Sequence, residues 1–149
     1  MLTRDALLAY AHFIAIFSLA SLLAGELFLL RKSLPATYVR TIQILDRWYG
    51  GTAGLVIVTG LCRLFFGFKG AEFYAHNPVF WMKMALFGVV ALLSIPPTLA
   101  YIKWNARTLP DGSLTLDDGE FSRLRTLLWA QVGIFLFIPL CATFMARGL

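Results

Sequence analysis

Charged residues are scarce in this chain. Lysine, arginine, aspartate and glutamate make up only 14% of its 149 residues, whereas hydrophobic residues make up 59%. A typical soluble domain is about a quarter charged and about half apolar. A chain with so little charge is therefore poorly suited to a fully hydrated surface, and its composition indicates that its outside, as well as its inside, faces hydrocarbon. The length fits a single domain.

The residue patterns of several catalytic and metal-binding classes are also missing. The two cysteines, Cys62 and Cys141, do not have C-x-x-C spacing, which argues against a zinc site or a dithiol redox pair. The sequence has no glycine-rich phosphate loop, no Ser/His/Asp set and no paired-carboxylate motif. The net charge of +5 does not indicate nucleic-acid binding, because the basic residues flank apolar runs.

Long apolar runs are abundant. A membrane-spanning helix needs about 20 predominantly apolar residues, and helices satisfy their own backbone groups in lipid. The sequence therefore predicts an all-α integral membrane protein, a single four-transmembrane-helix bundle over residues 1–149. The first run is longer than the apolar region of a signal peptide, so we interpret it as a retained helix. The predicted spans are residues 6–30, 46–68, 78–102 and 121–146.

The basic residues are distributed unequally between the two sides of this bundle. Because positive residues accumulate in cytoplasmic loops, the bias predicts cytoplasmic first and third loops, with both termini on the other side. The smaller group comprises Arg4, Lys69 and Arg147. The larger group comprises Arg31, Lys32, Arg40, Arg47, Lys103, Arg107, Arg123 and Arg125.

Three basic residues within the spans share one leaflet. His12 lies six residues into the first span and Lys83 five residues into the third. Since a helix rises about 1.5 Å per residue, both lie about 8–9 Å below the non-cytoplasmic surface. Arg63 approaches the same surface from the end of the second span. An ionisable group near the bilayer centre costs at least about 2.5 kcal/mol, so depth decides which of these positions need an explanation.

The chemistry of these three residues allows two interpretations. Neutral histidine is a common metal ligand and haem axial ligand, an unprotonated lysine can also bind a metal, and arginine binds carboxylates such as a porphyrin propionate. The functional interpretation is a porphyrin held by His12, Lys83 and Arg63. The alternative is a histidine hydrogen-bonded in the core, with the lysine and arginine reaching to headgroups; the residues alone favour this alternative. His76, in a loop, is predicted to be a surface histidine.

Glu26 belongs to the opposite leaflet. It lies fourteen residues after His12, which is within about 40° around a helix, so the two side chains are expected to share an inward face with Leu19. Arg47 begins the second span at the level of Glu26. The sequence therefore predicts a structural ion pair between Glu26 and Arg47.

The stretch DRWYGGTAGLVIVTGLCRLFFGFKGAEFYAHNPVFWMKMALF, residues 46–87, resembles the small bacterial membrane proteins grouped as DUF2214. The resemblance extends over nearly the whole chain. It implies a four-helix membrane protein of the bacterial inner membrane, with multiple passes.

The layout is more distantly similar to the HemJ-type protoporphyrinogen oxidases and the CopD-like membrane domains. HemJ-type proteins place a functional histidine in the first span and a lysine early in the third, where this chain has His12 and Lys83. The resemblance implies haem b bound at these two residues and, if the protein is an enzyme, an oxidoreductase that acts on a porphyrin. The chain departs from the WLHxK motif of that family, because Trp81 replaces the histidine, and its fourth span lacks a matching signature.

Two other functions remain open on the sequence. Pro96 and Pro97 should kink the third span, and polar groups stand at both ends of one face, so a transporter or channel subunit for a small solute or ion is an alternative. A bundle this small would then be expected to form a homo-oligomer. The third interpretation is a non-enzymatic membrane scaffold that acts through the polar third loop.

Overall fold

Four long helices dominate the computed structural model, which describes residues 2–67 and 70–147. Phe68, where the second predicted span ends, and Lys69 lie outside the described residues. All four long helices are apolar enough to cross a membrane, which confirms the predicted all-α membrane bundle. The elements in chain order are α1 (Leu2–Leu29), β1 (Ser33–Leu34), α2 (Ala36–Phe66), α3 (Gly70–Ala75), α4 (Pro78–Trp104), β2 (Leu114–Thr115) and α5 (Asp118–Ala146).

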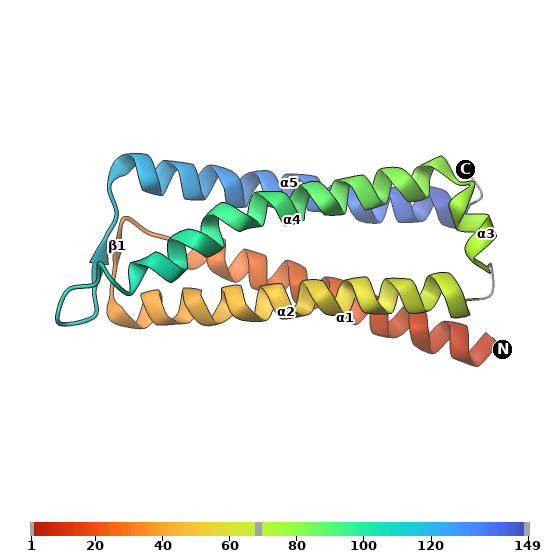
Figure 1. The fold of residues 1–149 in the computed structure, drawn as a ribbon, viewed down its shortest axis with the longest axis horizontal. Helices are drawn as coiled ribbons and strands as arrows, with labels where there is room; N and C mark the ends of the chain where they lie inside the picture. The colour runs from red at the N-terminus through yellow and green to blue at the C-terminus, as the bar shows by residue number, and fades with distance from the viewer. Residues whose placement is uncertain (1, 68–69, 148–149) are drawn as a thin grey trace.

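The long helices form two antiparallel hairpins, shown in Figure 1. The N-terminal hairpin consists of α1 and α2, and the C-terminal hairpin consists of α4 and α5. Strands β1 and β2 pair antiparallel, with Ser33 opposite Thr115 and Leu34 opposite Leu114, and so join the two hairpins at one end. We call this the sheet end, and the opposite end, where both termini lie, the termini end (Figure 1).

Polar residues at the helix starts determine where the helices begin. The Asn77 side chain accepts hydrogen bonds from the Val79 and Phe80 amides, and Pro78 occupies the first turn of α4. Asp117 accepts from the Glu120 amide at 2.6 Å and begins α5. Asparagine and aspartate before the first helical residue, and proline in the first turn, are typical of helix starts. Helix α2 begins ten residues before the predicted span, directly after Pro35, because its first turns lie outside the apolar run.

The most deeply buried side chains gather towards the sheet end. Trp104 and Tyr101 stack edge to face with ring centroids 4.8 Å apart, and the Trp104 indole N–H donates to Glu120. Gln43 of α2 donates to the Tyr101 carbonyl of α4, which ties the hairpins together at this level. Buried around these residues, at 0–1% exposure, are Leu34, Ile42, Leu124 and Leu128. The bundle is therefore fastened at its sheet end.

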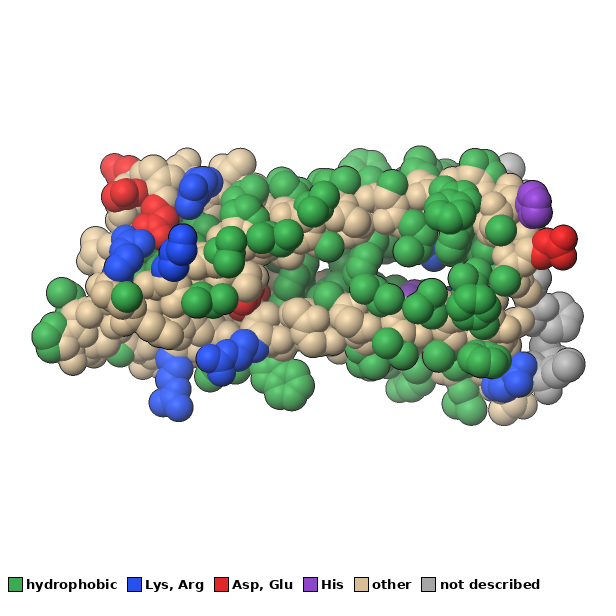
Figure 2. Space-filling model, in the orientation of Figure 1, with side chains coloured by type: hydrophobic (Ala, Val, Ile, Leu, Met, Phe, Trp, Pro, Cys, Tyr) green, Lys and Arg blue, Asp and Glu red, His purple; other side chains and the backbone are tan. Residues whose placement is uncertain are grey.

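The outside of the bundle is apolar over most of its length. Large side chains such as Phe17, Leu92 and Leu136 are 67–70% exposed, and Figure 2 shows hydrophobic groups along both layers while charged groups gather mainly at the sheet end. In a helical bundle of this composition such residues face lipid. The two-residue strands and the short helix α3 were not predicted, because segments this short carry no periodic signal.

Candidate functional site

A cavity lies between the two hairpins at the termini end. Its volume is about 110 Å³, and it is open on one side. Figure 2 shows the opening between the two layers on this half of the molecule. The lining side chains are aliphatic or aromatic except for His12 and Lys83. Two nitrogen-containing side chains therefore face an otherwise apolar space. Apolar pockets with a few polar groups are usual for sites that bind small molecules.

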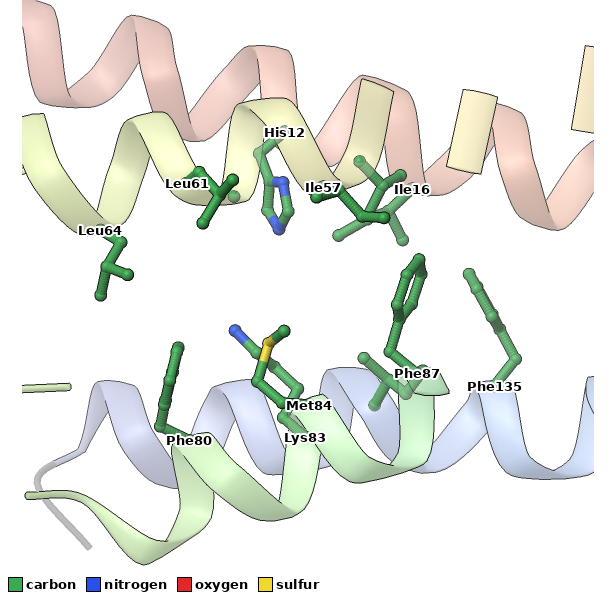
Figure 3. Close-up of a pocket in the computed structure, with 13 residues that line it drawn as sticks. His12, Ile16, Ile57, Leu61, Leu64, Phe80, Lys83, Met84, Phe87 and Phe135 are labelled. Carbon is green, nitrogen blue, oxygen red and sulfur yellow. The ribbon is translucent and has the colours of Figure 1, made fainter. Parts of the chain in front are cut away.

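The structure brings the three predicted site residues together. His12 comes from α1 and Lys83 from α4, and Figure 3 shows the imidazole and the amino group pointing into the cavity from opposite hairpins. An adjoining cavity of about 40 Å³ is lined by His12, Arg63 and Lys83 together. Residue counting predicted that these three residues lie at the same depth, and in the structure they line the same small cavity.

A threonine that sequence reasoning missed fixes the orientation of the histidine. The Thr59 hydroxyl donates to the Leu55 carbonyl at 2.8 Å, so its oxygen is left to accept from Nδ1 of His12, 2.9 Å away. This arrangement places the imidazole proton on Nδ1 and leaves the Nε2 lone pair free on the cavity side. Threonines often bond to their own helix, so nothing in the sequence distinguished Thr59.

Gly60 allows the imidazole to approach α2. A Cβ atom at this position would lie 3.3 Å from Cε1 of His12, which is tighter than an ordinary van der Waals contact. The pair Thr59–Gly60 therefore provides both the hydrogen bond and the space that seat the ring.

Arg63 lines the adjoining cavity and has a hydrogen-bond donor that is not used. Its guanidinium lies 5.9 Å from the Phe13 ring centroid, and its buried Nε–H has no hydrogen-bond partner. An unsatisfied buried donor is costly, and a guanidinium is suited to a planar carboxylate. The Lys83 ammonium lies 5.4 Å from the Phe80 ring centroid and forms no ion pair among the described residues.

The Glu26–Arg47 ion pair is not formed. Glu26 is 2% exposed, whereas Arg47 is on the exposed face of α2. The ion pairs among residues 2–67 and 70–147 are Lys32–Asp118 and Arg107–Glu120. Successive residues point about 100° apart around a helix, so Arg47 turns outward when its neighbour Asp46 faces inward.

The remaining candidates behave as surface or packing residues. His76 is exposed, as predicted, and its ring nitrogen lies 2.9 Å from the Glu72 carbonyl oxygen. Cys62 is partly buried and Cys141 is buried, and both are free. No three His, Cys, Asp or Glu side chains of the described ranges converge on one point.

Comparisons with known proteins bear on the whole chain. A family model described as "Predicted membrane protein (DUF2214)" matches residues 4–149. No curated protein and no solved structure matches the chain. None of these comparisons shows the similarity to HemJ-type oxidases or CopD-like domains.

Proposed function

The chain belongs to the DUF2214 family of predicted membrane proteins, and we propose that it binds haem b or a related porphyrin between its two hairpins and has a redox role. The observation that carries the proposal is the free Nε2 of His12, which faces Lys83 across an apolar cavity. The porphyrin, the redox role and the ligand positions all belong to this proposal.

The number of available ligands favours haem over a bare metal ion. A protein-bound zinc ion takes three or four protein ligands, whereas the described residues contain no cluster of that size. Haem brings four ring nitrogens of its own and requires only axial ligands from the protein. His12 and Lys83, one from each hairpin, are suited to that demand.

Each residue of the site has a distinct role in this proposal. His12, whose ring is held by the hydrogen bond to Thr59, would supply one ligand, and Lys83 would supply a second when its amine is unprotonated. The partnerless Nε–H of Arg63 supplies a donor for a propionate at the termini end. The aromatic and aliphatic lining excludes water from the macrocycle. Bound haem would supply one-electron redox chemistry at its iron.

The structure offers less support for a transport route. Between the level of His12 and that of Glu26, the inward face of α1 presents Ala15, Leu19 and Leu23, each at most 2% exposed. Val90 of α4, also 2% exposed, belongs to the same apolar core. A continuous polar path would have to cross this layer, so the geometry supports a binding site confined to the termini end better than a channel.

The proposal includes a location in the bacterial inner membrane with both termini on the non-cytoplasmic side. The cluster of basic residues at the sheet end supports it through the positive-inside rule. A phosphatase fused after Leu149, active only outside the cytoplasm, is expected to be active. If a reporter that is active only in the cytoplasm is active at the same position, the orientation is the opposite of the one proposed.

Spectroscopic titration tests the function. The purified protein in mild detergent, titrated with haem, is expected to give a saturable Soret band distinct from that of haem in detergent micelles. Iron-free protoporphyrin is the second probe, because Arg63 and the apolar lining bind the ring without axial ligands. If neither probe gives saturable binding, the proposal is wrong.

Thr59 offers a test of the tautomer argument. Replacement with valine keeps the size and removes the acceptor for Nδ1–H, so haem affinity should fall by about 10–100-fold, as for other residues that orient a metal ligand. Affinity for iron-free protoporphyrin should remain close to that of the wild type. The matched control is Thr41→Val, because Thr41 is a partly exposed residue of α2 whose hydroxyl bonds only to its own helix. Equal haem affinity in all three proteins would contradict the role of Thr59.

A further inference from the structure

A second polar cluster lies in the membrane half nearer the sheet end, away from the cavity. Glu26 of α1 is at its centre. The packing of Leu45 against Gly25, where a Cβ would lie 3.1 Å from Leu45 Cδ1, places Asp46 beside Glu26, and the two carboxyl groups interact electrostatically. All four long helices contribute to the cluster, whose other members are Tyr49, Thr98, Tyr101 and Gln131.

Glu26 is buried and forms no ion pair among the described residues. It is 2% exposed, and its Oε1 has no hydrogen-bond partner. The Tyr101 hydroxyl faces the Glu26 carboxyl group, but the contact does not reach the geometry of a regular hydrogen bond. Burial of an unpaired carboxylate in an apolar interior costs far more than burial of the neutral acid. The environment of Glu26 therefore suits a protonated carboxyl group.

Among the described residues, the surroundings of Glu26 contain acids but no counter-ion. The titratable groups that face Glu26 are Asp46 and Tyr49 from α2 and Tyr101 from α4. Helix α5 contributes the neutral Gln131, which accepts from the Tyr49 hydroxyl. Neither carboxyl group of the pair takes part in an ion pair within residues 2–67 and 70–147.

Asp46 differs from Glu26 in both hydration and bonding. Its carboxylate accepts from the Thr98 hydroxyl at 2.7 Å, and it is only partly buried. The donated hydrogen bond and the partial access to water make the ionised form less costly for Asp46 than for the fully buried Glu26. The two acids of the cluster are therefore suited to opposite protonation states, as in carboxyl pairs that share one proton.

We propose that Glu26 and Asp46 form a proton-binding site in which Glu26 holds the proton and Asp46 exchanges it with water at the sheet end. On release, the O–H bond of the Glu26 carboxyl breaks and the proton passes to the Asp46 carboxylate and then to water. Uptake follows the reverse order. The site does not depend on the porphyrin proposal, because it lies beyond the apolar layer and shares no residue with the cavity.

The packing of the cluster favours a proton over a metal cation. Gln131 and Tyr101 are each 1% exposed and Glu26 is 2% exposed, so the helices close around the acid. A calcium ion needs six to eight oxygen ligands in a cage of its own, whereas a proton needs no additional space. Two carboxyl groups in closely packed surroundings are therefore suited to a proton.

Infrared spectroscopy of the purified chain in detergent tests the site. The wild type at neutral pH is expected to show the carbonyl stretch of a protonated carboxylic acid, shifted in D₂O and lost when the pH is raised. Glu26→Gln should remove this band, whereas Glu72→Gln, on exposed α3, should leave it unchanged. Asp46→Asn should keep the band but move the pH at which it disappears.

Three results would overturn the proposal. The first is the absence of a protonated-acid band from the wild type at neutral pH. The second is survival of the band in Glu26→Gln. The third is loss of the band when Na⁺ or Ca²⁺ is added at constant pH, which would identify a cation site instead. Haem binding should be the same in Glu26→Gln as in the wild type, so failure here is distinguishable from failure of the porphyrin proposal.

Discussion

Replacing His12 with alanine is expected to weaken haem binding by about 100-fold or more. Loss of a residue that merely orients a metal ligand costs about 10–100-fold, and loss of the ligand itself should cost at least as much. The Soret band of the haem-loaded protein should therefore weaken and shift towards that of haem in micelles. Absorption titration of the variant in the same detergent gives the affinity.

Two controls separate ligation from general damage to the site. His76→Ala removes the other histidine of the chain, which is exposed on the surface, and should bind haem as the wild type does. Iron-free protoporphyrin should bind to His12→Ala nearly as well as to the wild type, because Arg63 and the apolar lining are intact. If His12→Ala kept the wild-type affinity and spectrum for haem, Nε2 would not be an iron ligand.

Replacing Trp104 with alanine is expected to lower the free energy of unfolding by about 3–5 kcal/mol, the usual loss for a large buried aromatic side chain. Trp104 is 0% exposed, packs against Tyr101 and donates to Glu120. It belongs to the core that joins the two hairpins, so the variant loses contacts from both. Denaturant unfolding in mild detergent, followed by circular dichroism, measures the change.

Trp48→Ala is the matched control for this loss. Trp48 is 66% exposed on the outside of α2, so its removal should change the free energy of unfolding by no more than about 0.5 kcal/mol. Similar losses in the two variants would show that the sheet-end core does not hold the hairpins together.

The four membrane-spanning helices could be predicted because they depend on a local signal. Apolar runs of sufficient length define the four long helices, and Asn77 and Asp117 mark two of the starts. The pairing of β1 with β2 could not be predicted, because it joins residues about 80 positions apart through only two residue pairs. Nothing in so short a segment identifies its partner.

The candidate site was accessible to sequence reasoning only in part. Depth along the helices placed His12, Arg63 and Lys83 at one level, and the structure brings them to adjoining cavities. The orienting contact of Thr59 depends on how α1 and α2 are rotated against each other, which residue counting does not give. The same rotation explains why Asp46, and not Arg47, lies next to Glu26.

The pairing of β1 with β2 also constrains the order in which the protein is assembled. One strand precedes α2 and the other precedes α5, so the sheet cannot close until the ribosome has made Thr115. Before that point, α1 and α2 lack the strand connection that fastens them to the other hairpin at the sheet end. The cavity lies between the two hairpins, so its lining is complete only when both have been made.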